Sequence, residues 1–377
     1  MILLALATLA TFVGFQLLLS VVPLYADEAG GGSSGAGLAT TAFMLSTVLT
    51  QVQMPRILDR FEYRTVLAIG LLLLGIPAFL YATVDGAAPI LVITLVRGIG
   101  FGIATVVFAA VVVELAPPER RGEALGLFGI AITLPTIFCN ALGLWLVDHS
   151  GYRIVFFLGG LGPLLGLLAV SGVRTYSHAR REGGEGGAGF LAGLRRGPLL
   201  RLFLLFSATT VAMGVLVTFL PLVAPGSGIF SAAGALLIVG LASTASRWWA
   251  GRFGDRHDPH ALLAPGLLVG ALGMAALSGT GPVLLGGAAL FGLSLGLLQN
   301  STLILIMNRV SKTEYGLGST LWNVSFDAGT GLGAFLFGFV VSVAGFSVAF
   351  YLSAGLLVVA LVLVPLDRYA GATRREP

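Results

Sequence analysis

The chain has little of what soluble proteins use most. Charged residues make up only 10% of its 377 residues, whereas soluble domains carry about 25%. It has a single cysteine, Cys139, which excludes a disulfide within the chain and a cysteine-rich metal site. Its four histidines are scattered, so the sequence offers no metal-binding constellation. We therefore expect a protein with no metal and no other cofactor.

What the chain has in abundance is apolar sequence. Hydrophobic residues make up 56% of it, and twelve runs are long enough to cross a hydrocarbon core of about 30 Å. The runs are continuous rather than alternating, which excludes a transmembrane β-barrel and predicts α-helices. They lie at 3–24, 38–56, 65–83, 89–113, 123–147, 152–172, 200–222, 231–250, 261–279, 282–306, 316–341 and 346–366.

The basic residues predict an orientation. Of the 21, all but Arg97 and Arg153 fall in alternate connections on one side, or in the C-terminal tail. Basic loops stay in the cytoplasm, so we expect a multi-pass protein of the plasma (inner) membrane with both termini cytoplasmic. Because this distribution is a topology signal, the net charge of +4 does not indicate nucleic-acid binding.

One polar segment divides the twelve runs into six and six. It contains Glu-Gly-Gly-Glu-Gly-Gly-Ala at 182–188 together with several arginines, a composition typical of flexible linkers. The sequence therefore predicts an N-terminal six-helix bundle at 1–173, a cytoplasmic linker at 174–198, and a C-terminal six-helix bundle with a short tail at 199–377.

The two halves repeat one another. Gly-x-x-x-Gly at 98–102 recurs at 292–296, and Ser-Gly-Tyr at 150–152 recurs at the same spacing as Ala-Gly-Phe at 344–346. Parallel repeats of this kind occur in one large class of transporter. The expected fold is an all-α membrane protein with twelve transmembrane helices in two pseudo-symmetric six-helix bundles.

The loop after the second run carries a family motif. Residues 55–64 read Pro-Arg-Ile-Leu-Asp-Arg-Phe-Glu-Tyr-Arg, and residues 251–256 read Gly-Arg-Phe-Gly-Asp-Arg. Both resemble the Gly-x-x-x-Asp-Arg-x-Gly-Arg-Arg loop of the major facilitator superfamily, although Pro55, Glu62 and Tyr63 depart from it. In that family the loop latches the cytoplasmic side of the outward-open state. The resemblance implies a gating role for Asp59, Arg60, Arg64, Asp255 and Arg256.

Two further stretches support the resemblance, which covers the whole chain. Residues 95–102, Leu-Val-Arg-Gly-Ile-Gly-Phe-Gly, look like the Arg-x-x-x-Gly element of proton-coupled members. The pair Leu134-Pro135 is half of the Gly-Pro signature common in exporters, which implies a gating role for Pro135. The motifs are silent on the substrate.

Arg97 and Asp327 are charged residues deep inside predicted helices. An unpaired charge there costs several kcal/mol, so such residues usually pair or face a water-filled path. We predict that both take part in proton coupling. A structural role stays open for each: Arg97 can bond to backbone carbonyls, and Asp327 can form a polar seam with Ser319 and Asn323 on the same helix face.

Polar amides in the apolar runs are candidates for the substrate cavity, although amides also bind helices to one another. They are Gln16, Asn140, Gln299, Asn300 and Asn323.

The expected function is secondary active transport by alternating access: proton-coupled efflux of a small organic molecule by an antiporter that acts as a monomer in the lipid bilayer. One alternative is an importer of a sugar or metabolite. An alternative of another class is a membrane receptor or scaffold that transports nothing. We do not expect an enzyme, because no acid–base or nucleophile set with an orienting partner is visible.

Overall fold

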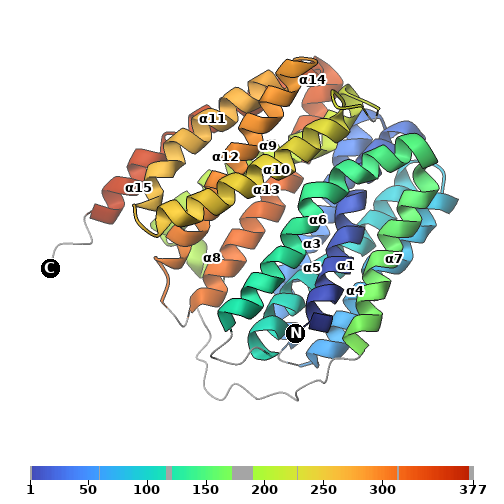
Figure 1. Ribbon diagram of the computed structural model, residues 1–377, viewed down its shortest axis with the longest axis horizontal. Helices are drawn as coiled ribbons and strands as arrows, with labels where there is room; N and C mark the ends of the chain where they lie inside the picture. The colour runs from blue at the N-terminus through green and yellow to red at the C-terminus, as the bar shows by residue number, and fades with distance from the viewer. Residues whose placement is uncertain are drawn as a thin grey trace. The chain divides into compact units, whose positions relative to one another are not determined.

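The computed structural model describes residues 2–58, 60–115, 121–171, 190–226, 228–311 and 314–372. Every regular element in these ranges is a helix (Figure 1). Each of the twelve runs predicted from the sequence coincides with a long helix or a pair of consecutive helices, which confirms the expected all-α membrane fold. Asp59 and most of the predicted linker lie outside the described residues.

The helices divide as follows. In the first half they are α1 (Ile2–Leu19), α2 (Val21–Ala26), α3 (Gly32–Leu58), α4 (Tyr63–Leu80), α5 (Ala87–Leu115), α6 (Arg121–Ser150) and α7 (Tyr152–Ser171). In the second half they are α8 (Phe190–Leu194), α9 (Gly197–Val223), α10 (Ala232–Gly254), α11 (Leu263–Ala276), α12 (Pro282–Met307), α13 (Tyr315–Ala344), α14 (Phe346–Ala360) and α15 (Leu363–Ala372).

Length and hydropathy mark ten spans in the described chain as able to cross a membrane. The first, Ile2–Met54, contains two of the predicted runs. Helix α10 is not among the ten, because the polar residues of its second half, among them Arg247 and Arg252, lower its mean hydropathy. The helices of all twelve predicted runs are therefore present. The number of spans among the described residues is ten rather than twelve because one span joins two runs and α10 is too polar to be counted.

The connection between the first two spans is shorter than the sequence suggests. Helix α2 leads directly into a π-helical turn at Asp27–Gly31, and α3 begins at Gly32. The reversal occurs at Gly30 and Gly32, whose φ angles are 90° and 56°. Glycine adopts this region without a steric penalty, so three consecutive glycines replace the expected loop.

Contacts divide the chain into two compact units. The first comprises Met1–Arg181 with Val217–Ala233, and the second comprises Glu182–Leu216 with Gly234–Pro377. Helix α9 therefore contributes to both, a division that the sequence did not suggest. The predicted boundaries at 173 and 199 stay a prediction.

Glycines set the helix packing in the first unit. There α1 packs on α6 and α7, and α5 packs on α3 and α4. Gly98 and Gly102 of α5 lie against α3, where a Cβ on Gly98 would overlap Ser46 Oγ and the Phe43 carbonyl oxygen. Close approach of this kind gives membrane helices the dispersion contacts that stabilise their association.

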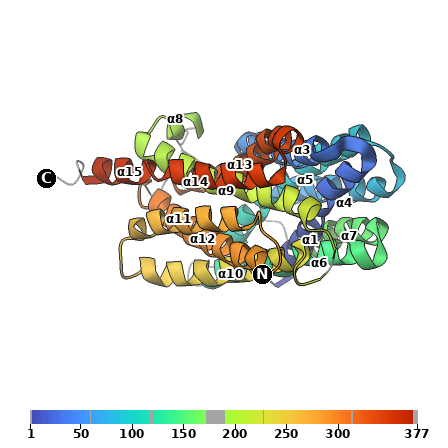
Figure 2. The ribbon, with the colours of Figure 1, turned by 90° about the horizontal axis from the view of Figure 1, so that it is seen from above.

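The second unit uses the repeated motif in the same way. Gly292 and Gly296 of α12 lie against the α10 backbone at Val239 and Ser243. Helix α11 packs on α12 and α14, and Figures 1 and 2 show α11 and α12 side by side. The Gly-x-x-x-Gly repeat thus joins the corresponding pair of helices in each half.

Candidate functional site

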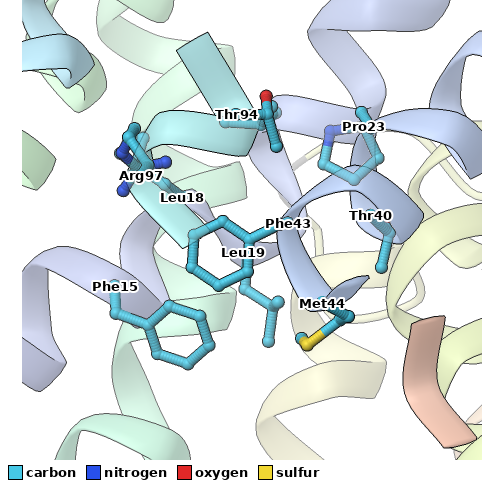
Figure 3. Close-up of a pocket in the computed structure, with 11 residues that line it drawn as sticks. Phe15, Leu18, Leu19, Pro23, Thr40, Phe43, Met44, Thr94 and Arg97 are labelled. Atoms are coloured by element: carbon cyan, nitrogen blue, oxygen red, sulfur yellow. The ribbon is translucent and has the colours of Figure 1, made fainter. Parts of the chain in front are cut away.

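A pocket of about 300 Å³, counting its part open to solvent, lies within the first unit. Helices α1, α2, α3 and α5 form it, and Figure 3 shows Arg97 beside Leu18 and Thr94 at one end. Most of the wall is apolar, and the polar lining residues are Thr40, Thr94 and Arg97. The full lining is Phe15, Leu18, Leu19, Val22, Pro23, Ala39, Thr40, Phe43, Met44, Thr94 and Arg97.

Arg97 is the charged group of this pocket and is only 2% exposed. Its Nε donates a hydrogen bond of 3.2 Å to the carbonyl oxygen of Leu74 on α4. Its guanidinium carbon lies 5.8 Å from the centre of the Phe43 ring and 5.5 Å from that of Tyr81, within the range of cation–π attraction. Its Nη2 is buried and has no hydrogen-bond partner among the described residues.

Arg97 bonds to a backbone carbonyl, as its possible structural role requires, but this bond uses only part of the donor capacity of the guanidinium. A guanidinium carries five N–H donors, and the bond to Leu74 uses one of them. A buried donor without a partner costs about 1–3 kcal/mol, and more for a charged group. This arrangement leaves Arg97 with unused capacity to bind a group that enters the pocket.

Hydrogen bonds and aromatic packing hold the walls of the pocket. Tyr81 Oη and Thr94 Oγ1 are 2.8 Å apart, and Thr94 Oγ1 donates to the Ile90 carbonyl oxygen at 2.7 Å. On the α3 side, the Phe15 and Phe43 rings stack with centroids 5.5 Å apart. The rings that flank the guanidinium are thus fixed by neighbours and do not depend on Arg97 for their positions.

Gln16 and Asn140, predicted to line a cavity, are buried and do not line this pocket. Gln16 Nε2 donates to Thr136 Oγ1 at 3.0 Å and so joins α1 to α6. That bond agrees with the alternative role of an amide that links helices. Gln16 Oε1 and Asn140 Oδ1 are buried with no partner among the described residues.

In the second unit, Asp327 is 7% exposed on α13. Two residues before it, Ser325 Oγ lies 2.9 Å from Ser207 Oγ, and Thr210 Oγ1 donates to the Ser325 carbonyl oxygen at 3.0 Å. A polar seam between α9 and α13 is therefore present, and Ser325 forms it. Asn323, expected in that role, is exposed and bonds to Ser319 of its own helix.

Gln299 and Asn300 lie on α12 near a second cation, the half-buried Arg247. Trp322 Nε1 donates to the Gln299 carbonyl oxygen at 3.3 Å, and the guanidinium of Arg247 lies 6.0 Å from the Trp322 ring centre. Asn300 Nδ2 is buried without a partner among the described residues. The sequence interpretation grouped Arg247 with the cytoplasmic connections, whereas the structure places it inside α10.

The sequence analysis missed a cluster of charges in the second unit. Asp367, 1% exposed, accepts two hydrogen bonds from Arg309, at 2.7 Å and 2.6 Å, and one from Arg201 at 3.3 Å. His260 Nε2 lies 3.5 Å from the same carboxylate. The four residues come from segments far apart in the sequence, so no local pattern indicated the cluster.

The residues predicted to gate lie at helix ends or inside a helix. Arg60, Arg64, Asp255 and Arg256 are exposed, and Pro135 is buried within α6, which continues through it. Asp59, the central residue of the motif, lies outside the described residues. Gating by these residues stays a prediction.

Buried charges inside long apolar helices, arranged in two units, define this chain as a polytopic α-helical membrane protein. The sequence model of the Major Facilitator Superfamily matches residues 4–282 and 240–376, so the chain belongs to that family.

Comparisons with individual proteins agree with this assignment. An uncharacterized MFS-type transporter of Methanocaldococcus jannaschii is 26% identical over 43% of this chain, and the quinolone resistance protein NorA of Staphylococcus aureus is 21% identical over 42%. Each match spans 41% of the relative's length. A point mutant of the nucleoside transporter NupG superimposes with a TM-score of 0.80 at 14% identity, over 97% of this chain and 99% of NupG.

A bacterial homolog of the human lysosomal transporter Spinster, in an inward-facing and unoccupied conformation, also gives a TM-score of 0.80. It is 15% identical, and the match covers 100% of this chain and 98% of the homolog. At such identities, these structures show the fold alone.

Proposed function

We propose that this protein is a secondary active transporter that works by alternating access and exports a small organic molecule in exchange for protons. The observation that carries the proposal is a buried charge inside a membrane helix of each unit, Arg97 in α5 and Asp327 in α13. Such residues are expensive in a bilayer and commonly mark substrate or ion pathways. Membership of the Major Facilitator Superfamily supports transport as the activity.

Asp327 is the proposed proton carrier. It is a buried acidic residue far from both ends of a membrane helix, where a charged side chain is costly and commonly marks an ion pathway. A carboxyl that loads a proton on one side and releases it on the other couples the gradient to the conformational change. In the same helix, the hydroxyl bonds of Ser325 hold α13 to α9.

The other residues predicted from the sequence have roles in gating and in substrate binding in this proposed transport cycle. The loops that contain Asp59 and Asp255 latch the cytoplasmic side, Pro135 shapes α6, and polar amides such as Asn300 contact the substrate. The protein acts as a monomer in the plasma membrane with both termini in the cytoplasm. The match to NorA, which is named for quinolone resistance, favours efflux over uptake.

Flux measurements in proteoliposomes test this function. Candidate substrates are first chosen by their ability to raise the melting temperature of the purified protein, since a ligand that binds the folded state stabilises it. Flux of the selected compound is then measured with and without an imposed pH gradient. The proposal requires the gradient to drive the compound against its own concentration difference, in the direction opposite to the protons. Co-directional movement would indicate the import alternative, and no flux at all would indicate a receptor or scaffold.

A further inference from the structure

We propose that the pocket beside Arg97 binds the acidic group of a small organic anion whose body is apolar and aromatic. This inference rests on the proposed transport function and names its substrate class. The site lies wholly within the first unit, where α1, α2, α3 and α5 line the pocket.

The charge of Arg97 has no counter-charge in the pocket. Arg97 is 2% exposed, and the pocket lining contains no acidic residue. Within the part of the chain that the structure describes, Arg97 forms no ion pair. The rings of Phe43 and Tyr81 offset part of the charge, but cation–π attraction amounts to about 0.5–2 kcal/mol, less than the cost of burying an unpaired charge. An anionic ligand supplies the missing counter-charge.

Arg97 also supplies the free hydrogen-bond donor of the pocket. The other polar lining residues already have partners: Thr94 Oγ1 bonds to the Ile90 carbonyl oxygen, and Thr40 Oγ1 lies 2.9 Å from Thr218 Oγ1 of the same unit. Arg97 Nη2 alone among these groups is buried without a partner. The polar group that the pocket offers to a ligand is thus a cationic donor. Such a donor binds a carboxylate or sulfonate and repels a protonated amine.

The guanidinium of Arg97 is held in position by its neighbours. Its Nε is fixed by the Leu74 carbonyl oxygen at 3.2 Å, and the Phe43 and Tyr81 rings lie close to it. This contact on Nε leaves the opposite end of the fork for the ligand. A group held in place before the ligand arrives loses less conformational entropy on binding.

The remaining wall selects the body of the ligand. Phe15, Leu18, Leu19 and Met44 offer aromatic, aliphatic and thioether surface. The pocket is partly open to solvent. A compact acid with one or two rings places its ring system against this apolar wall and its acidic group at Arg97.

The test compares three probes of nearly equal shape on the full-length protein in lipid nanodiscs: 2-naphthoate, the neutral 2-naphthamide and the cationic 2-naphthylmethylammonium. Affinity is measured by calorimetry, without any pH gradient. We expect naphthoate to bind at least about tenfold more tightly than naphthamide, since a charge-assisted bond is worth about twice a neutral one. We expect the ammonium compound not to bind. Equal affinity for acid and amide, or a preference for the cation, overturns the proposal.

Two substitutions and a control assign the effect to Arg97. We expect Arg97→Lys, which keeps the charge but loses the fork, to weaken naphthoate binding about tenfold, and Arg97→Gln to abolish it. Arg247→Gln removes the arginine inside α10 of the second unit and should leave binding unchanged. Loss of naphthoate binding in Arg247→Gln, or unchanged binding in Arg97→Lys, overturns the proposal. If Arg97→Gln does not fold, the lysine variant and the three probes on the wild-type protein still test whether Arg97 binds the acidic group.

The outcome is separable from that of the proposed function. Naphthoate binding that depends on Arg97, with no flux of any compound, leaves the anion site standing and rejects transport. Gradient-driven flux of neutral or cationic compounds, with no naphthoate binding, leaves transport standing and rejects the anion site.

Discussion

Arg309 and Asp367 form a bidentate ion pair, with Nη1 2.7 Å from Oδ1 and Nη2 2.6 Å from Oδ2. Arg201 and His260 approach the same carboxylate, which is 1% exposed. One acidic side chain therefore ties the start of α9, the segment before α11, the end of α12 and the beginning of α15 into one cluster. Two arginines on one carboxylate leave positive charge uncompensated as soon as the carboxylate is removed.

We expect Asp367→Asn to destabilise the protein by about 3 kcal/mol, because removal of one partner of a buried pair leaves its counter-charges unpaired. The measurement is the melting temperature of the purified protein in detergent. Asp148→Asn, the same change at an exposed site at the end of α6, is the matched control and should have little effect. Equal melting temperatures for wild type and Asp367→Asn would show that the cluster contributes nothing to stability.

A second ion pair predicts a dependence on pH. Arg196 donates two hydrogen bonds to Glu314 at the surface, and with the Ser311 backbone N–H it lowers the pKa of Glu314 from 4.5 to about 2. A lowered carboxyl pKa contributes stability that is fully present above pH 4.5 and disappears as the pH falls toward 2. Glu314→Gln should therefore lower the melting temperature at pH 7 and become indistinguishable from wild type near pH 2.

Salt provides the check on that pair. Because it lies at the surface, high ionic strength should shrink the difference between wild type and Glu314→Gln at pH 7. A difference that persists unchanged at low pH would mean that Glu314 acts through packing rather than through its charge.

The Gly-x-x-x-Gly contact predicts an effect of a single methyl group. In Gly98→Ala the added Cβ overlaps Ser46 Oγ and the Phe43 carbonyl oxygen, so α5 must move away from α3. We expect a loss of about 2 kcal/mol from overpacking, seen as a lower melting temperature. Because Phe43 and Arg97 belong to this contact region, ligand binding at the pocket should weaken too.

Gly129→Ala is the control for that substitution. A Cβ at Gly129 of α6 meets nothing within 4 Å, and alanine favours a helix interior by about 0.5–1 kcal/mol over glycine. It should therefore leave the protein unchanged or slightly more stable. A Gly98→Ala protein as stable as Gly129→Ala would refute the close helix contact.

Asp327 carries the prediction on coupling. Asp327→Asn keeps the size of the side chain and removes its ability to carry a proton, so it should abolish accumulation driven by a pH gradient and spare substrate binding and exchange. Both are measured in the same proteoliposomes. Accumulation by the Asn variant at the wild-type level would reject the role of Asp327 in coupling and leave it a structural role in α13.

The orientation predicted from the basic residues is tested by labelling. In a chain whose Cys139 is replaced by alanine, a cysteine at Gly184 in the predicted linker should resist an impermeant thiol reagent added outside intact cells. A cysteine at Asp85, an exposed residue before α5, should react, since it falls in a connection on the other side. The reverse pattern would invert the topology.

The sequence by itself determined the helices and the family. An apolar run of about 20 residues can satisfy its backbone hydrogen bonds in a bilayer only as a helix, so 89–113 and 316–341 predicted α5 and α13 to within a few residues. The burial of Arg97 and Asp327 followed from the same reasoning, because both stand in the middle of such runs. The paired glycine motifs at 98–102 and 292–296 anticipated the repeat.

Only the tertiary structure decided which side chains meet. The structure shows that Arg97 contacts the Leu74 carbonyl oxygen and two aromatic rings rather than a carboxylate. These contacts depend on how α3 and α4 pack around α5. The cluster around Asp367 draws on segments separated by most of the second half, and each residue reads as an ordinary loop charge in its local context. Local sequence specifies a helix because its hydrogen bonds are local, whereas ion pairs and pockets form between helices, whose relative positions no single segment encodes.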